Sequence, residues 1–148
     1  MSEQKLIIVR GLSGSGKSTW TLNYIKSHDN AVRVNRDSIR SAYFGTEEAY
    51  GVNEALVTRA QNNLILCALS AGCTVVVDNT NIDWAHVLDV AQLAHSRKAK
   101  VEIHEIDCTL EEAQLRNINR AAMGGRLVPA HVIDSQHERY EQTKGWTL

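Results

Sequence analysis

A glycine-rich turn near the start of the chain constrains the fold more than any other feature of its 148 residues. Residues 11–18 read GLSGSGKS and match the pattern G-x-x-x-x-G-K-[ST] in full. The preceding run KLIIVR predicts a buried strand, and the residues that follow the turn predict a helix. A turn in this position can hold phosphate oxygens with its backbone N–H groups, at the positive end of the following helix.

Each residue type in the turn has a chemical reason. Glycines let the backbone turn its N–H groups toward a phosphate, Lys17 can neutralise the β- and γ-phosphates of a nucleotide, and the Ser18 hydroxyl can ligate Mg²⁺. The residues expected to bind the donor nucleotide are Gly11, Ser13, Gly14, Ser15, Gly16, Lys17, Ser18 and Thr19. The alternative is a glycine turn that exposes a lysine with no ligand.

Strands and helices alternate along the rest of the chain. The pattern predicts strands at 5–10, 31–35, 74–78 and 100–107. It predicts helices at 18–26, 37–43, 53–71, 83–97, 109–121 and 129–142. Such alternation gives a parallel sheet of four or more strands with helices on both faces, an α/β fold. The ligand of such a sheet lies beyond the carboxyl ends of its strands.

Composition limits the class of protein. The length predicts one domain over residues 1–148, and 43% apolar with 22% charged residues is typical of a globular chain. The net charge of −1 means that a polyanion site must be a local cluster of Arg and Lys. Three cysteines without a C-x-x-C pair favour buried thiols in the cytoplasm, and we expect neither a zinc site nor contact with a membrane.

Two further groups of polar residues follow predicted strands. Asp37 and Arg40 are three residues apart on one helix face, where the carboxylate could take a proton from an acceptor hydroxyl and the guanidinium could hold an anion. A surface ion pair is the alternative, and the position at the ligand edge favours function.

Asp78 ends an apolar strand like a Walker B residue and could lie near Mg²⁺. Asn79 and Thr80 could bond a sugar or phosphate, whereas Asn81 could equally satisfy backbone groups of the loop. No acidic residue follows Asp78 and no N-K-x-D motif occurs, which counts against an AAA-type motor and a GTPase switch.

Three arginines surround a glycine pair near the end of the chain. Arg116 and Arg120 share a helix face, and Arg126 follows Gly124 and Gly125, which can act as a hinge. A lid over about 116–128 could close on a triphosphate and supply charge to the transition state. A solvated basic helix face is the alternative.

Taken together, GLSGSGKSTW, VNRDSIR, VVVDNTN and LRNINR…GGRLVP closely resemble the kinase domain of the 5′-polynucleotide kinases, over about residues 6–139. The resemblance implies a kinase-type P-loop NTPase fold with an Arg-rich lid, in which the second and third strands lie to one side of the first. It also implies a magnesium-dependent transfer of the γ-phosphate of ATP or another NTP to 5′-OH ends of DNA or RNA, with a role in nucleic-acid repair.

The resemblance assigns roles residue by residue. It implies that Lys17 and Ser18 bind the donor phosphates and Mg²⁺, and that Asp37 is the general base for the 5′-OH. It makes Arg40 the contact to the phosphate on the 3′ side of the acceptor nucleotide. Arg116 and Arg120 become lid arginines at the transferring phosphate.

Two other functions stay open at this point. One is a small-molecule kinase of the same superfamily, of the gluconate, shikimate or antibiotic type. The other is a non-catalytic nucleotide-binding module, which would show neither ATP turnover nor stimulation by a 5′-OH oligonucleotide.

Overall fold

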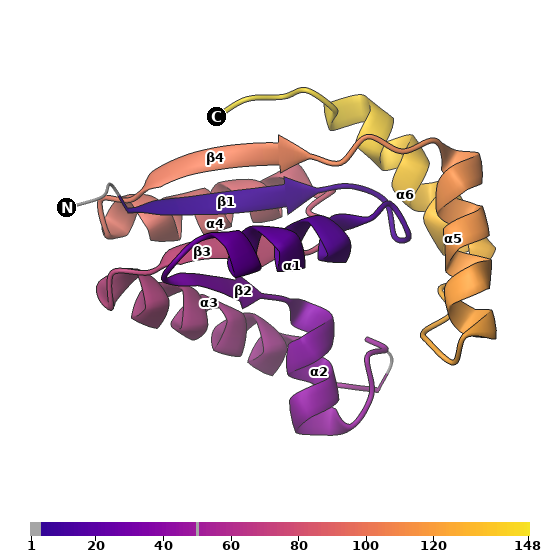
Figure 1. The fold of residues 1–148 in the computed structure, drawn as a ribbon, viewed down its shortest axis with the longest axis horizontal. Helices are drawn as coiled ribbons and strands as arrows, with labels where there is room; N and C mark the ends of the chain where they lie inside the picture. Colours follow the sequence, from indigo (N-terminus) through magenta and orange to yellow (C-terminus); the bar gives the residue numbers. More distant parts are fainter. Residues whose placement is uncertain (1–3, 50) are drawn as a thin grey trace.

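A four-stranded parallel sheet forms the centre of the computed structural model, which describes residues 4–49 and 51–148 (Figure 1). The strand order is β2-β3-β1-β4, so the second and third strands lie to one side of the first, as predicted. The strands are β1 (Lys5–Arg10), β2 (Ala31–Val34), β3 (Thr74–Asp78) and β4 (Lys100–Glu105). The predicted α/β fold is therefore confirmed.

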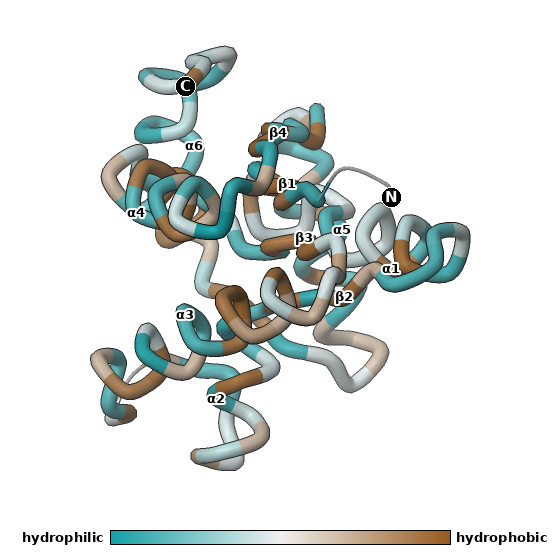
Figure 2. The backbone as a smooth tube through the Cα atoms, turned by 90° about the vertical axis from the view of Figure 1, so that its left-hand side faces the viewer, coloured by the Kyte–Doolittle hydropathy of each residue, from teal (hydrophilic) through white to brown (hydrophobic). Residues whose placement is uncertain are grey.

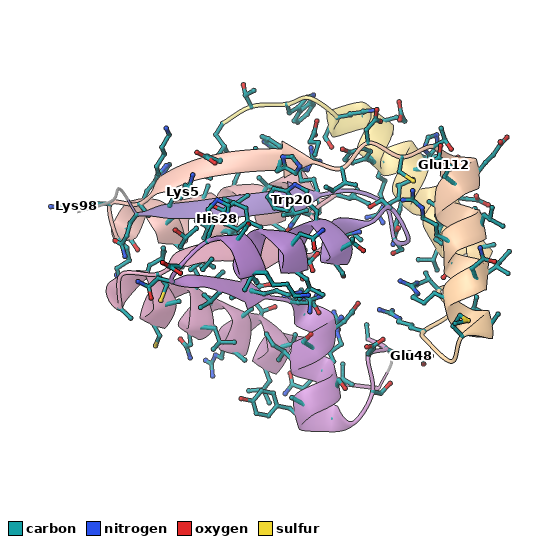
Figure 3. All side chains as sticks on the ribbon, in the orientation of Figure 1. Lys5, Trp20, His28, Glu48, Lys98 and Glu112 are labelled. Atoms are coloured by element: carbon teal, nitrogen blue, oxygen red, sulfur yellow. The ribbon has the colours of Figure 1, made fainter. Side chains whose placement is uncertain are left out.

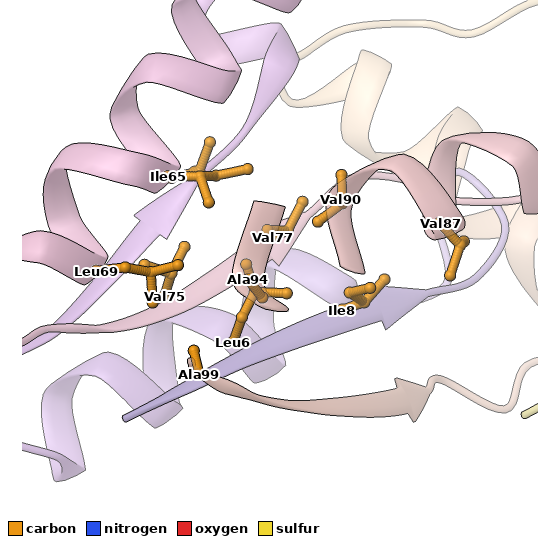
Figure 4. Packing of buried hydrophobic residues seen from close by; sticks show 11 residues of the cluster. Leu6, Ile8, Ile65, Leu69, Val75, Val77, Val87, Val90, Ala94 and Ala99 are labelled. Atoms are coloured by element: carbon orange, nitrogen blue, oxygen red, sulfur yellow. The ribbon is translucent and has the colours of Figure 1, made fainter. Parts of the chain in front are cut away.

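Both faces of the sheet are buried because the inner residues of its central strands, LIIV in β1 and VVV in β3, are apolar. Leu6 and Ile8 of β1 face a core under α3 (Glu54–Ser70) and α4 (Trp84–Ser96) (Figure 4). Ile7 and Val9 alternate with them and pack toward the opposite helix, α1 (Lys17–Ser27). Figure 2 shows α3 and α4 on one side of the sheet and α1 on the other. Helices cover both faces, as a parallel sheet requires.

Side-chain caps set the helix starts that the sequence predicted. Asn53, Asp83 and Thr109 accept hydrogen bonds from the backbone N–H groups of the first turns of α3, α4 and α5 (Leu110–Ala122). Asn35 caps α2 (Arg36–Phe44) in the same way. This cap explains why β2 ends at Val34, one residue earlier than predicted, because the Asn35 side chain accepts from Ser38 N and starts the helix.

Arg10, at the end of β1, is fully buried and holds the last helix, α6 (Ala130–Thr143), against the sheet. Its guanidinium pairs with Glu105 at 2.9 Å and donates to Thr143 Oγ1 at 2.6 Å and to Asn81 O at 2.8 Å. It also stacks 5.1 Å and 5.2 Å from the rings of Trp84 and Tyr140. A buried charge is tolerated here because several acceptors surround it.

The cysteines differ in part from the expectation. All three are free thiols, but Cys67 is exposed and Cys73 and Cys108 are half-buried, so none is a core residue. Within the described ranges, no helix is long and apolar enough to span a membrane. Over the same residues, no cluster of three His, Cys, Asp or Glu side chains could hold a metal ion.

Candidate active site

The carboxyl ends of the strands open into a cavity of about 1110 Å³. The glycine-rich turn, the start of α2, the end of β3 and helix α5 surround it, and Figure 3 shows the side chains that these elements carry. Seven of the lining side chains are Lys or Arg and four are carboxylates. The lining cations are Lys17, Arg33, Arg36, Arg40, Arg116, Arg120 and Arg126. A chain of net charge −1 therefore gathers positive charge at one place, which suits a polyanionic ligand.

The turn has the backbone conformation that its glycines allow. Gly14 and Gly16 have φ angles of 82° and 104°, in the left-handed region. A Cβ at Gly14 would lie 2.5 Å from the carbonyl oxygen of Ala113 in α5, so the turn packs directly against the lid helix. Gly11 does not line the cavity; a Cβ there would meet Ser15 Oγ at 2.8 Å, and Gly11 serves the close packing of the turn.

Lys17 is buried and its ammonium group donates to Leu12 O at 2.6 Å, within the turn. Burial lowers the pKa of Lys17 to about 8, although the charges of Asp78 and Asp37 raise it. The ammonium group is therefore largely buried and feels the charges of two carboxylates. Phosphate oxygens in the cavity would offer it a better partner than the Leu12 carbonyl.

Gln136 in α6 holds the turn from the side, a contact that sequence reasoning missed. Its Oε1 accepts from Ser13 N at 3.0 Å, and its Nε2 donates to Ser13 Oγ at 3.0 Å. The buried hydroxyl of Ser15 has no hydrogen-bond partner in the described structure. Buried polar atoms are seldom left unsatisfied, so this hydroxyl is a free hydrogen-bonding group at the turn.

Ser18 and Asp78 lie on the same side of the cavity and are joined by Arg33, which the sequence analysis did not single out. Arg33 Nε donates to Asp78 Oδ2 at 2.8 Å, and Nη2 donates to Ser18 Oγ at 3.2 Å. The Asp78 side chain is 1% exposed. A hydroxyl and a buried carboxylate are hard oxygen ligands of the kind that Mg²⁺ takes together with nucleotide phosphates and water.

Asp37 and Arg40 line the cavity and form the ion pair expected from their spacing, at 2.7 Å. Arg126 reaches the other oxygen of Asp37 from the far wall, at 2.8 Å. Glu54, also missed from the sequence, binds Arg40 through both of its oxygens at 2.7 Å and 3.1 Å. Burial raises the pKa of Glu54, but hydrogen bonds from Arg40 and Arg36 outweigh it and hold the pKa below its ordinary value.

The residues after Asp78 are largely engaged within the protein. Asn79 accepts from Arg36 N and donates to Gln61 Oε1, both at 2.9 Å, so its expected contact with substrate stays a prediction. Thr80 lines the cavity, and its carbonyl accepts from Gly11 N at 3.1 Å. Buried Asn81 donates to Val9 O at 2.6 Å. This contact favours the alternative that Asn81 satisfies backbone groups rather than binding a ligand.

The lid arginines occupy two positions. Arg116 Nη1 donates to Ser15 O at 2.8 Å and so lies against the glycine-rich turn. Arg120 Nε donates to the carbonyl of Arg126 at 2.9 Å. Buried Asn117 accepts from Val128 N and donates to Val128 O, which fastens the loop after α5. The sequence suggested Gly124 and Gly125 as a hinge, but it did not predict the hydrogen bonds between Asn117 and Val128.

The fold and this site define a kinase-type P-loop domain: a phosphate-binding turn after the first strand, an acidic strand end beside it and arginines on a helix above. The chain belongs to a family described as an AAA domain, AAA_33, which matches residues 6–143. The family description refers to the P-loop domain. The residue after Asp78 is Asn79, so the described site lacks the second carboxylate that an ATP-hydrolysing AAA-type motor is expected to have.

Individual related proteins have more specific names than the family does. The chain is 29% identical over 133 residues to a protein of Autographa californica nuclear polyhedrosis virus, provisionally named a bifunctional polynucleotide kinase/RNA ligase. A solved chain of the Pnkp1/Rnl/Hen1 RNA repair complex covers all of this chain with 28% identity and a TM-score of 0.89. A gluconokinase from Sinorhizobium meliloti 1021 covers 99% of it with 17% identity and a TM-score of 0.65, a likeness of fold alone.

The relatives are longer than this chain. It spans 19% of the viral protein and 47% of the solved chain from the repair complex, whereas it spans 81% of the gluconokinase. The matched part of the viral relative corresponds to 81% of this chain. The likeness therefore concerns the P-loop domain.

Proposed function

We propose that residues 1–148 form a kinase domain, with a lid at about 116–128, that transfers the γ-phosphate of ATP or another NTP to the 5′-OH end of a nucleic acid. The observation that carries the proposal is the pairing of Asp37 with Arg40 in the same cavity as the glycine-rich turn. A carboxylate that can accept a proton and a guanidinium that can hold a phosphate are the two groups that an acceptor nucleotide needs. A role in RNA repair is supported by the solved chain from an RNA repair complex, and the viral relative is named for an RNA ligase as well as a polynucleotide kinase.

The donor is bound by the turn and the lid. Backbone N–H groups of Ser13–Thr19 and the ammonium group of Lys17 hold the phosphates, and Arg116 and Arg120 add charge as the phosphoryl group is transferred. Arg126 acts at the same place from the loop after α5. Each of these residues lines the cavity.

Ser18 and Asp78 would hold Mg²⁺, which supplies charge neutralisation at the donor phosphates when it is bound. The donor set fits this ion because both ligands are oxygens and Asp78 already has a cation as its partner. The remaining steps fall to the chain itself. Asp37 takes the proton of the acceptor hydroxyl, and Arg40 orients the acceptor through the neighbouring phosphate.

A small-molecule kinase is the second candidate, since a gluconokinase shares the fold over nearly the whole chain. The cavity favours the first candidate because Arg36 and Arg40 line its acceptor side, where an acceptor with a phosphate of its own would find cations. Glu54 pairs with both arginines and holds them in place. A cytoplasmic location, expected from the unpaired cysteines, stays a prediction.

The test is transfer of radiolabelled γ-phosphate from ATP, with Mg²⁺, to a panel of acceptors. The panel holds a 5′-OH RNA, a 5′-OH DNA, their 5′-phosphorylated forms as controls, gluconate and shikimate. We expect label on the 5′-OH oligonucleotides and none on the blocked forms. Label on a sugar acid with none on either oligonucleotide would support the second candidate and exclude the first.

A further inference from the structure

Arg33 comes from the middle of β2, yet its side chain reaches the two residues proposed to hold magnesium. Its Nε lies 2.8 Å from Asp78 Oδ2 and its Nη2 lies 3.2 Å from Ser18 Oγ. The Arg33 side chain is 26% exposed, and that of Asp78 is 1% exposed. One guanidinium therefore contacts both oxygens from the open side of the cavity.

The buried carboxylate explains why a cation is needed at this point. A carboxylate removed from water is costly unless it is paired, and Arg33 pairs with Asp78 directly. Lys17 is close in sequence to Ser18, but its ammonium group is directed to Leu12 O. The charge of Asp78 is thus balanced by a residue of a neighbouring strand.

Magnesium and Arg33 need the same oxygens. Mg²⁺ binds its ligands at about 2.0–2.1 Å with near-octahedral geometry and strict limits on what else lies close. A guanidinium in hydrogen-bond contact with Ser18 Oγ and Asp78 Oδ2 occupies that space and carries like charge. A metal ion bound to these same two oxygens would exclude the guanidinium from them.

We propose that Arg33 is a built-in competitor of the divalent cation. It neutralises Asp78 and holds Ser18 while the metal site is free, and it must leave both when the metal–nucleotide complex binds. The affinity for the metal is then set by an exchange of one cation for another. This inference rests on the proposed function in taking the cavity as a magnesium–nucleotide site, and it is independent of the acceptor.

The experiment measures metal affinity without catalysis. Mn²⁺ is titrated into protein saturated with ADP, and free Mn²⁺ is followed by electron paramagnetic resonance, for wild type, Arg33→Met and Arg33→Gln. Arg97→Met is the matched control, because Arg97 is exposed and bonds Ser70 Oγ at a distance from the cavity. Circular dichroism melting checks that each variant is folded.

We expect both Arg33 variants to bind Mn²⁺ more tightly by about ten- to a hundred-fold, the worth of a hydrogen bond to a charged group, with Arg97→Met unchanged. An unchanged Mn²⁺ affinity would overturn the proposal. A weaker affinity would overturn it as well and would make Arg33 a positioning residue for Asp78. If Arg33→Met does not fold, Arg33→Gln, which keeps an amide to bond Asp78, carries the test.

The same measurement in Asp78→Asn protein distinguishes a failure of this inference from a failure of the proposed metal site. In Asp78→Asn protein the buried charge is gone and only the contact of Arg33 with Ser18 remains, so adding Arg33→Met should give a much smaller gain in Mn²⁺ affinity. A gain of the same size in both backgrounds would show that Mn²⁺ binds away from Asp78. That result would contradict the metal site of the proposed function rather than the competition alone.

Discussion

Arg126 Nη1 lies 2.8 Å from Asp37 Oδ2, an ion pair that joins the loop after α5 to the first turn of α2 across the mouth of the cavity. Arg40 holds the other oxygen of the same carboxylate at 2.7 Å. The proposed general base is therefore contacted by one arginine from its own helix and one from the lid. This relationship couples the position of the lid to the acceptor side of the site.

The lid arginines should differ in their effect on transfer. Removal of a transition-state arginine costs about 10³–10⁵ in rate, and we expect Arg120→Ala and Arg116→Ala to fall in or near this range. Arg126→Ala should cost less, about ten- to a hundred-fold, because its partner is Asp37 and a charge-assisted bond is lost. Single-turnover rates with a 5′-OH oligonucleotide measure all three. Equal small losses at the three positions would favour a solvated basic face.

Lys17→Met should separate function from stability. We expect phosphoryl transfer to be abolished, because the charge that stabilises the phosphates is lost. The nucleotide-free protein should become more stable, since burial lowers the pKa of Lys17 to about 8 and the fold therefore disfavours the ammonium form. The Tm should rise by about 2–4 °C for each kcal/mol gained in a chain of this size. Near-normal turnover in the folded variant would contradict the assignment of the turn.

Tyr140 predicts an alkaline loss of stability. Burial, with the nearby charge of Glu105, raises its pKa from 10.0 to about 12. The folded state then holds the phenol proton between pH 10 and 12 where the unfolded state releases it, so stability is complete below pH 10 and is lost as the pH rises through this window. At pH 11 the loss is on the order of 1 kcal/mol.

Denaturant unfolding of wild type and Tyr140→Phe at pH 8 and pH 11 checks this. Phenylalanine cannot ionise, and it keeps the buried ring while losing only the Tyr140 hydroxyl, which lies near Glu105. The variant should therefore match wild type at pH 8 and exceed it at pH 11. A parallel decline of the two proteins would contradict the expected window.

Arg40 should read the phosphate beside the reacting nucleoside. Arg40→Ala should lower kcat/KM for a 3′-phosphorylated nucleoside by about ten- to a hundred-fold, the worth of a charge-assisted hydrogen bond. The parent nucleoside lacks that phosphate, so we expect it to be a poor acceptor with either protein and nearly insensitive to the substitution. Equal losses for both acceptors would exclude this role for Arg40.

The sequence predicted the residues that follow strands, because parallel strands bring their carboxyl ends to one edge whatever the details of packing. Residues 13–18 of the turn, Asp37, Arg40 and Asp78 meet in one cavity for this reason. The starts of α3, α4 and α5 were equally predictable, since local caps determine them.

Arg33, Glu54 and Gln136 could not be placed in the same way. Each lies within or at the start of an element, and its contact depends on how that element packs against another. Arg33 did leave a signal: a charged residue interrupts the apolar strand AVRV, which is unusual for a strand covered by helices. Gln136 in α6 had no comparable mark in the sequence.

Asp37, as the base that accepts the proton of a 5′-hydroxyl, is the central residue of the proposed mechanism. The deciding measurement is the single-turnover rate of radiolabelled phosphate transfer from ATP to a 5′-OH oligonucleotide by wild type and Asp37→Asn, with nucleotide affinity followed by the fluorescence of Trp20 beside the turn. Loss of a general base should lower the rate by about 10²–10⁴ while nucleotide affinity stays close to that of wild type. An Asp37→Asn protein that transfers phosphate at the wild-type rate would contradict the role of Asp37 as the general base.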